Sequence, residues 1–182
     1  MRVISGTARG TKLLSVPGDT TRPILDRVKT SLFDILRHRL PGTNWLDLFA
    51  GSGAVGIEAL SQGAEHVTFI DAEPKAVATI KENLEKTRFS TQSEVRLTDA
   101  FLYLRKSERE FDIIYIAPPQ YQSLWIEALQ TVAERPHLVK NDGMIVIQID
   151  PSEEVPFSLA QFEEVDRREY GKTLLMFLTK KV

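Results

Sequence analysis

Five short apolar segments alternate with helical stretches along most of the chain, and this alternation limits the fold more than any other feature. The apolar segments lie at residues 44–49, 66–71, 94–98, 111–116 and 144–149. The stretches with helical spacing of apolar residues lie at about 53–62, 74–88, 100–107 and 121–135. Near-continuous apolar strands separated by helices are typical of a parallel sheet covered on both faces. The sequence therefore predicts a doubly wound, Rossmann-like α/β fold.

The last part of the chain departs from this alternation. Residues 162–168 and 173–179 read as two strands joined through Tyr170 and Gly171. Because so short a connection suits antiparallel strands, we expect a β-hairpin added to the edge of a mostly parallel sheet.

The first part of the chain also stands apart. Residues 2–5 and 12–16 read as two short extended pieces, and Thr21-Arg22-Pro23 opens a helix. We expect a basic N-terminal extension over residues 1–41, made of a β-hairpin and a helix, packed on a body over residues 42–182.

Charge is distributed unevenly along the chain. The formal net charge is −2, but residues 1–40 hold eight Lys or Arg against three acidic residues, a local charge of +5 that leaves −7 for the remainder. A basic arm on an acidic body fits a partner that carries phosphates. It equally fits a solvated surface with uneven charge.

Composition excludes several classes of site. Cysteine is absent and the three histidines are scattered, which rules out disulfides, cysteine nucleophiles and Cys-ligated metals. The longest apolar run, residues 144–147, is far shorter than a membrane span, and no apolar signal-peptide core follows Met1. We therefore expect a cytoplasmic monomer with no metal and no membrane partner.

A glycine-rich loop follows the first strand of the body. Gly51, Gly53 and Gly56 satisfy G-x-G-x-x-G at a strand-to-helix turn, where glycines let a ligand approach the backbone closely. This spacing fits NAD, FAD and other adenosine-bearing cofactors equally well. Asp71, at the end of the next strand, suits a pair of ribose hydroxyls, and it also suits an ordinary strand-end acid or helix cap.

Three features favour S-adenosylmethionine among these cofactors. Asp47 lies inside the end of the first strand, where a carboxylate suits the cationic amino and sulfonium groups of that cofactor. Asp99 and Ala100 are placed to bind the adenine edge, although Asp99 can equally be the N-cap of its helix. The chain also ends in a hairpin where a dinucleotide fold has a second nucleotide-binding half. The residues predicted to hold the cofactor are Asp47, Phe49, Ala50, Gly51, Ser52, Gly53, Asp71, Ala72, Asp99 and Ala100.

Residues 46–63 resemble motif I of class I methyltransferases. The segments Arg2–Gly6, Arg9–Leu13 and Thr21–Pro23, with the tail Arg168–Lys172, carry a narrower resemblance over essentially the whole chain. They are similar to the small bacterial enzymes of the RsmD type, which methylate N2 of a guanine in 16S ribosomal RNA. The resemblance implies S-adenosylmethionine as cofactor and 16S rRNA or the small ribosomal subunit as partner.

The resemblance also implies a catalytic turn after the fourth strand of the body. Enzymes of this family carry an acid or amide there, then Pro-Pro, then Tyr or Phe. The side-chain oxygen accepts hydrogens of the guanine amine and orients its lone pair, and the aromatic ring stacks on the base. Here the turn reads Ala117-Pro118-Pro119-Gln120-Tyr121, so Ala117 replaces the acceptor and Gln120 the aromatic residue.

Several interpretations of this altered turn remain open. The carbonyls of Ala117 and Pro118 suffice as acceptors while Tyr121 stacks on the base, or Gln120 supplies the lost oxygen. Alternatively, guanine-N2 activity is lost and the protein binds its cofactor and RNA without that reaction. A methyltransferase with another substrate is also compatible with these residues, whereas Asp47 disfavours an NAD-dependent dehydrogenase.

An RNA substrate requires cationic contacts to its phosphates. The residues predicted to make them are Arg9, Lys12, Arg22 and Arg27. Arg22 and Arg27 flank the start of the predicted N-terminal helix, and they are also placed to close the cofactor pocket.

Overall fold

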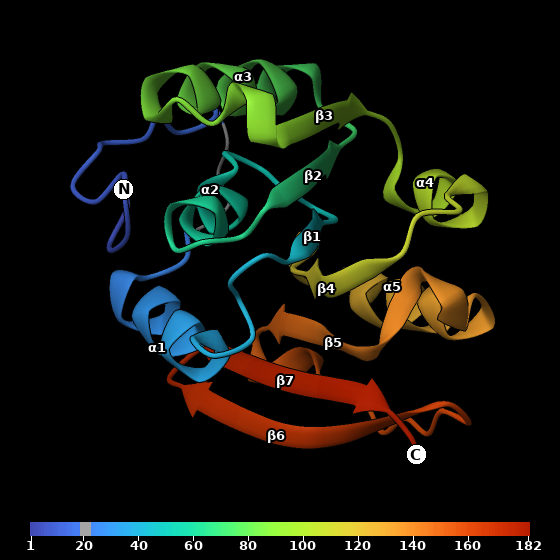
Figure 1. The fold of residues 1–182 in the computed structure, drawn as a ribbon. Helices are drawn as coiled ribbons and strands as arrows, with labels where there is room; N and C mark the ends of the chain where they lie inside the picture. Colours follow the sequence, from blue (N-terminus) through green and yellow to red (C-terminus); the bar gives the residue numbers. More distant parts are fainter. Residues whose placement is uncertain (19–22) are drawn as a thin grey trace.

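A computed structural model describes residues 1–18 and 23–182. Within these segments the strands are β1 (Asn44–Asp47), β2 (His66–Asp71), β3 (Ser93–Leu97), β4 (Phe111–Ile116), β5 (Val139–Ile149), β6 (Phe162–Tyr170) and β7 (Thr173–Lys180). They form one sheet in the order β3-β2-β1-β4-β5-β7-β6 (Figure 1). Strands β1 to β5 are parallel, and β7 runs antiparallel to β5 and β6. The predicted mostly parallel sheet with an antiparallel C-terminal hairpin is confirmed.

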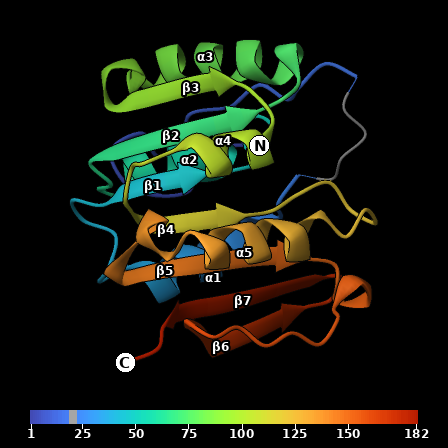
Figure 2. The same ribbon diagram turned by 90° about the vertical axis from the view of Figure 1, so that its right-hand side faces the viewer.

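The helices cover both faces of this sheet. In the described residues they are α1 (Asp26–Leu36), α2 (Ala54–Ser61), α3 (Pro74–Thr87), α4 (Ala100–Lys106), α5 (Leu124–Glu134) and the 3-10 helices η1 (Ser90–Gln92), η2 (Pro136–Leu138) and η3 (Pro151–Glu153). Helices α1, α2 and α3 lie on one face, and α4 and α5 lie on the other (Figures 1 and 2). None of the helices in the described part of the chain is long and apolar enough to cross a membrane.

The two faces of the sheet support two separate apolar cores. Successive side chains of a strand point to opposite faces, so neighbours in β1 belong to different cores. Trp45 packs in the core beneath α1, α2 and α3, whereas Leu46 packs in the core beneath α4 and α5. Both side chains are fully buried, which explains why the strands read as nearly continuous apolar runs.

The N-terminal extension contains less regular structure than the sequence predicts. Its hairpin is reduced to one isolated antiparallel bridge between Arg2 and Lys12, flanked by backbone hydrogen bonds. The helix begins at Asp26 and not at Thr21-Arg22-Pro23, because Leu25 still has extended backbone angles (φ −68°, ψ 143°). Thr21 and Arg22 themselves lie outside the described residues.

Two boundaries in the body also differ from the predicted ones. Helix α5 begins at Leu124 and not at Tyr121, because Tyr121 and Ser123 adopt left-handed φ values of 63° and 53°. Strand β5 begins at Val139, earlier than the predicted start at residue 144. Its pairing with β4 changes register between Phe111 and Ile113.

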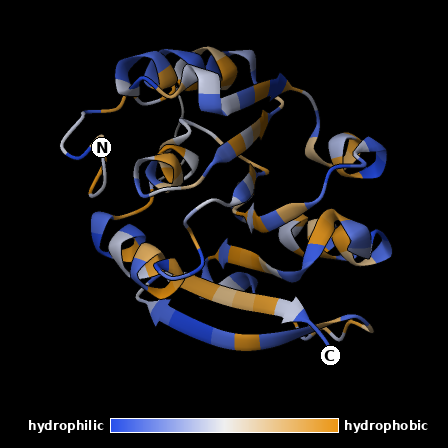
Figure 3. Cartoon of the chain, in the orientation of Figure 1, coloured by the Kyte–Doolittle hydropathy of each residue, from blue (hydrophilic) through white to orange (hydrophobic). Residues whose placement is uncertain are grey.

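The hairpin strands β6 and β7 differ sharply in hydropathy (Figure 3). Residues Leu174–Leu178 of β7 are buried between β5 and β6, whereas β6 exposes charged side chains such as Glu163 and Arg168. Charged residues on an edge strand oppose pairing with another chain. The β6 edge of the sheet is therefore protected against pairing with a strand of another chain.

A buried ion pair joins the N-terminal extension to the body. The Lys29 ammonium lies 3.2 Å from a carboxylate oxygen of Glu58, and the two side chains are 1% and 0% exposed. Lys29 also donates to the carbonyl oxygen of Arg2 at 2.7 Å. Glu58 accepts hydrogen bonds from the backbone N–H groups of Ile4 and Ser5, both at 2.9 Å. The Glu58 carboxylate on α2 thereby holds both α1 and residues 2–5 in place.

Asn83 of α3 makes a second connection between the extension and the body. Its side chain accepts from the N–H of Leu14 at 2.8 Å and donates to the carbonyl oxygen of the same residue at 3.0 Å. The same amide also donates to the carbonyl oxygen of Ser52 at 3.0 Å. Asn83 therefore ties the extension and the glycine-rich loop to one point of α3.

Removing the buried carboxylate tests this account of the packing. Glu58→Ala leaves the Lys29 ammonium buried without a charged partner, so we expect it to lower the free energy of unfolding by about 3–5 kcal/mol. Asp34→Ala is the control, because the Asp34–Arg37 pair is exposed and its loss costs less than about 1 kcal/mol. Urea unfolding followed by circular dichroism measures both. Equal losses in the two variants would contradict the assigned role of Glu58.

Candidate active site

The glycine-rich loop runs from the end of β1 to the start of α2 and is held against the end of β2. Gly51 and Gly53 adopt left-handed φ values of 57° and 81°, which glycine reaches without steric cost. The N–H of Gly51 donates to a carboxylate oxygen of Asp71 at 2.8 Å, and the N–H of Ala50 donates to the carbonyl oxygen of Ile70 at 2.9 Å. The loop is thus preformed by backbone contacts with the neighbouring strand.

The third glycine of the spacing serves packing. A Cβ atom on Gly56 would lie 2.3 Å from the ring of Phe69 and 2.9 Å from a methyl group of Val67. Helix α2 therefore approaches β2 closely only because residue 56 has no side chain.

Asp47 is a buried carboxyl group beneath this loop. It is 1% exposed, and one of its oxygens accepts from the N–H of Gly56 at 3.2 Å. Burial raises the pKa of Asp47 to about 7, the Gly56 hydrogen bond partly offsets this, and the charge of Asp71 adds to it. A carboxylate in such surroundings gains most from a cationic partner, because no side chain of the described residues forms an ion pair with it. The site therefore suits the cationic end of a ligand.

The remaining predicted cofactor residues surround the ends of β2 and β3. Asp71 accepts from the N–H of Glu73 at 2.9 Å in addition to that of Gly51, so it braces two loops at once. Asp99 accepts from the N–H of Leu102 at 2.8 Å, which realises the capping role that the sequence left open for it. Asp99 itself is exposed.

Two aromatic rings form an apolar wall beside these acids. Phe49 and Phe101 meet edge to face with their centroids 6.3 Å apart, and Ala100 is buried next to them. Ser52 is half-buried and Ala72 is exposed. The predicted cofactor residues therefore lie together where the parallel strands β1, β2 and β3 have their carboxyl ends.

The Pro-Pro turn follows β4 at the same edge. Ala117 and Pro118 are half-buried, whereas Pro119, Gln120 and Tyr121 are exposed. Tyr121 is 70% exposed, and its left-handed backbone turns the chain before α5. Because Asp47 pairs with Tyr115 of β4, the glycine-rich loop and the turn leave adjacent strands.

Two acidic residues that follow β5 hold this turn. The N–H of Tyr121 donates to a carboxylate oxygen of Glu153 at 2.7 Å. The Tyr121 hydroxyl donates to Asp150 at 3.3 Å, and the negative charge of Asp150 raises the pKa of Tyr121. We call Tyr121, Asp150 and Glu153 the turn clamp.

The basic residues of the extension do not gather at this turn. Arg9 follows Ala8, whose N–H binds the Ser61 hydroxyl at the far end of α2. Lys12 lies on the single bridge of the extension, and Arg27 lies at the start of α1 beside Gly171 of the β6–β7 turn. Arg22 is outside the described residues.

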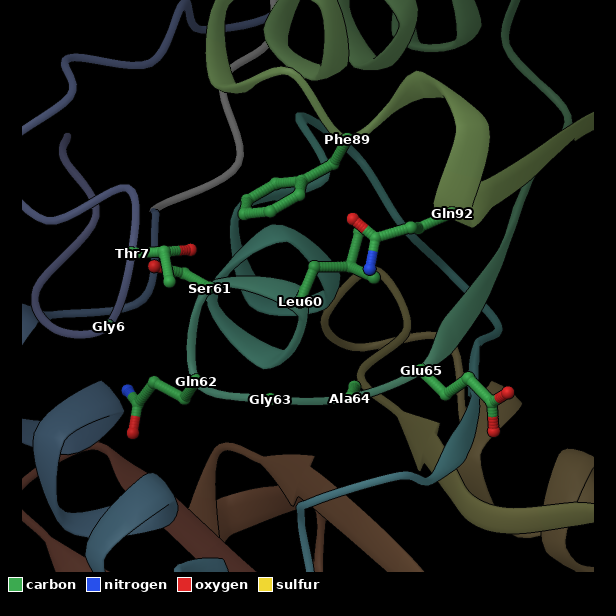
Figure 4. A pocket seen from close by; sticks show the side chains of 10 residues that line it. All are labelled: Gly6, Thr7, Leu60, Ser61, Gln62, Gly63, Ala64, Glu65, Phe89 and Gln92. Atoms are coloured by element: carbon green, nitrogen blue, oxygen red, sulfur yellow. The ribbon is translucent and has the colours of Figure 1, made fainter.

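A hollow of 560 Å³ lies between the extension, the end of α2 and η1 (Figure 4). Thr7, Ser61, Gln62 and Phe89 are among its lining residues. The predicted cofactor and turn residues do not line it, and it lies at the opposite edge of the sheet from them. In the described segments no cluster of His, Cys, Asp and Glu has the composition to hold a metal ion.

The model of the family described as Conserved hypothetical protein 95 matches residues 1–179 of this chain. The chain belongs to this family.

Members of the Conserved hypothetical protein 95 family and their structures resemble it over most of its length. A Bacillus subtilis protein named "Putative rRNA methyltransferase YlbH" is 39% identical over 176 residues, 95% of each chain. Ribosomal RNA small subunit methyltransferase D of Haemophilus influenzae is 32% identical over 153 residues, which are 82% of this chain and 79% of the relative. The solved "Putative methyltransferase yhhF" from Escherichia coli matches with a TM-score of 0.89 at 26% identity, covering 100% of this chain and 98% of that one. The resemblance to the RsmD type and the class I methyltransferase fold are confirmed.

Sequence reasoning missed several residues that shape this member of the Conserved hypothetical protein 95 family. Asn83 and Glu58 read as ordinary helix positions, because their partners are far away in the sequence. Asp150-Pro-Ser-Glu153 forms a capping box on η3, and that four-residue pattern is visible in the sequence. It predicts a short helical turn after β5 but does not reveal the contact with Tyr121. Lys172 belongs to the tail segment that carries the family resemblance, but the sequence gives no sign that its charge helps to lower the pKa of Asp150.

The raised pKa of Asp47 makes stability depend on pH. The unfolded chain releases this proton above about pH 4, whereas the folded protein holds it until about pH 7. Raising the pH across this window therefore favours unfolding. Asp47→Asn removes the titration, so we expect the variant to gain up to about 3 kcal/mol on the parent between about pH 5 and pH 8.

Urea unfolding of the parent and Asp47→Asn at both pH values measures this gain. Asp142→Asn, which removes an exposed carboxyl group, is the control and should follow the parent at both pH values. If the stability difference between Asp47→Asn and the parent does not change with pH, Asp47 does not carry the raised pKa.

Proposed function

We propose that the protein transfers a methyl group from S-adenosylmethionine to the exocyclic N2 amine of a guanine in 16S rRNA. The observation that carries this proposal is the placement of a buried carboxyl group, Asp47, and a Pro-Pro turn at the ends of adjacent strands. Membership of a family with relatives named as rRNA methyltransferases supports the class of reaction.

The residues at the carboxyl ends of β1 to β3 fit S-adenosylmethionine. Asp47 faces the cationic amino acid end of the cofactor. Asp71 accepts hydrogen bonds from the ribose hydroxyls through the same carboxylate oxygens that accept from the N–H groups of Gly51 and Glu73. Asp99 and Ala100 bind the adenine edge beside the wall formed by Phe49 and Phe101. The cofactor supplies an electrophilic methyl group on a positively charged sulfur.

The turn after β4 handles the substrate base. A guanine amine is a weak nucleophile because its lone pair is delocalised into the ring, so hydrogen-bond acceptors must reorient it. The backbone carbonyls of Ala117 and Pro118 are two such acceptors. Tyr121, with its ring exposed, stacks on a base that has left its helix, a contact worth about 1–3 kcal/mol. The proton lost from the amine passes to water at this open edge.

The N-terminal extension supplies phosphate contacts through Arg9, Lys12 and Arg27, all of which are exposed. Arg22 belongs to the same proposal on sequence grounds. A ribosomal RNA substrate places the protein in the cytoplasm, and the protected β6 edge is compatible with action as a monomer.

Methyl transfer to unmodified small ribosomal subunits tests this function. We expect radiolabel from S-adenosylmethionine to appear on N2 of a single guanine, mapped by nuclease digestion and mass spectrometry. Asp47→Ala is the negative control, because it weakens cofactor binding while leaving the turn intact. Label on another base, or on ribosomal protein, would replace the guanine assignment with a different substrate. Cofactor binding without any label would show that the reaction is lost.

Charge reversal in the extension tests the RNA contacts. We expect Arg9→Glu with Lys12→Glu to weaken RNA binding and to lower the salt dependence of log affinity by about two, one for each lost phosphate contact. Affinity for S-adenosylmethionine should not change. Lys81→Glu with Lys86→Glu on α3 is the matched control, since it changes net charge equally on another surface. Binding titrations over a range of salt concentrations measure these effects. Equal RNA affinity for parent and extension variant would exclude the contacts.

A further inference from the structure

Strand β5 places polar side chains next to the position where Ala117 lacks an acceptor. The register pairs Tyr115 of β4 with Val146 of β5, and Ile116 with Ile147. Continuing this register by one residue places Ala117 beside Gln148. Alternate residues of a strand share a face, which puts Gln148 and Asp150 on the face that carries Ala117. The strand adjacent to the turn therefore brings an amide and a carboxylate to the substrate side of the sheet.

Gln148 and Asp150 differ in how much of the hydrogen-bonding capacity of their side-chain oxygens is already used. The Gln148 carbonyl oxygen accepts from the Tyr115 hydroxyl at 2.6 Å, a short bond that commits it. One oxygen of Asp150 accepts from the N–H and the hydroxyl of Ser152 at 2.9 and 2.7 Å. Within the described residues its other oxygen accepts only from the Tyr121 hydroxyl, at 3.3 Å. Asp150 thus keeps an acceptor oxygen aimed at the turn.

The surroundings keep Asp150 ionised and fixed. The two Ser152 donors hold the pKa of Asp150 below its usual value, so the group is a carboxylate at neutral pH. The residue is only 7% exposed, and its backbone begins η3 as the N-cap of a capping box with Glu153. A charged acceptor with a fixed orientation is what a weakly nucleophilic amine requires.

We propose that Asp150 is the side-chain acceptor for the substrate amine, in place of the acid or amide missing at Ala117, and that Glu153 positions Tyr121 beside it. This inference rests on the proposed function. Asp150 accepts one amine hydrogen in place of the Ala117 carbonyl, and the carbonyl of Pro118 accepts the other. The Tyr121 hydroxyl yields its place on Asp150 to the base.

Glu153 connects the acceptor to the stacking ring. It binds the N–H of Tyr121 at 2.7 Å through its carboxylate, and its own carbonyl oxygen accepts from the Trp125 indole at 3.1 Å. A non-glycine residue with φ of 63° carries a backbone strain of about 1–3 kcal/mol, which persists only where neighbouring contacts impose it. Glu153 is the contact that imposes it on Tyr121, and it keeps the ring at the mouth of the site.

Substitutions at residues 117 and 150 test the assignment in the full-length protein with unmodified small subunits. We expect Asp150→Ala to lower kcat by about 10²-fold and Asp150→Asn, which keeps a carbonyl acceptor, to stay within about tenfold of the parent. Ala117→Asp added to Asp150→Ala should recover at least about tenfold, because it restores an acceptor from the neighbouring strand. Glu154→Gln, an exposed carboxylate that pairs with Arg167, is the matched control and should retain parental kcat.

Binding measurements separate this role from a structural one. Affinity of Asp150→Ala for S-adenosylhomocysteine should match the parent, and Asp150→Asn, which keeps an N-cap side chain on η3, should also match the melting temperature of the parent. An RNA hairpin carrying 2-aminopurine, which has the same exocyclic amine, should show quenching by the parent and weaker quenching by Asp150→Ala. Glu153→Ala should raise the KM for RNA more than it lowers kcat, since it frees Tyr121 without removing the acceptor.

The outcomes distinguish this inference from the proposed function. A parent that labels guanine N2, with Asp150→Ala equally active, overturns the role of Asp150 alone. Loss of activity that Ala117→Asp does not restore, together with a lowered melting temperature, overturns it in favour of a structural role. A parent that labels no guanine overturns the proposed function and this inference with it.

Discussion

The buried pair of Lys29 and Glu58 is the interaction on which the arrangement of the whole molecule depends. An ion pair with both side chains removed from water is tolerated only when hydrogen bonds satisfy the remaining donors and acceptors. Here the carbonyl of Arg2 and the N–H groups of Ile4 and Ser5 do so. Residues 2–5 and α1 must therefore dock together on α2, since neither alone completes the surroundings of Glu58.

Helix α2 transmits this docking to the cofactor side of the sheet. All eight of its residues are buried, and it carries Glu58 near one end and the glycine-rich loop at the other. The absent side chain of Gly56 lets the helix lie close to β2, and the same residue donates the hydrogen bond that reaches Asp47. A helix held so tightly keeps the loop preformed, so binding a ligand there requires little ordering. Asn83 adds a second tether from the extension to the loop.

The sequence predicted the features that depend on local pattern and missed those that depend on distant contacts. The mostly parallel sheet with its C-terminal hairpin, the two covered faces and the glycine-rich loop follow from periodicity and spacing. The left-handed Tyr121 did not, because its conformation is imposed by Glu153, which lies 32 residues further along the chain. The predicted start of α1 was too early, since Leu25 still has extended backbone angles before the helix. The predicted cofactor and turn residues lie at the carboxyl ends of the parallel strands, whereas the basic residues Arg9, Lys12 and Arg27 do not gather there.

The two departures of the turn from its family pattern have a common electrostatic explanation. Asp150 and Glu153 already place two carboxyl groups against the turn, and both bind Tyr121. An acid at residue 117 would lie near Asp150, which follows the adjacent strand β5, and two like charges close together disfavour ionisation of both. Alanine there leaves one ionised acceptor, and the aromatic ring moves one residue along the chain to Tyr121, within reach of the same pair. The replacement of the acceptor and the shift of the aromatic residue are therefore parts of one rearrangement centred on η3.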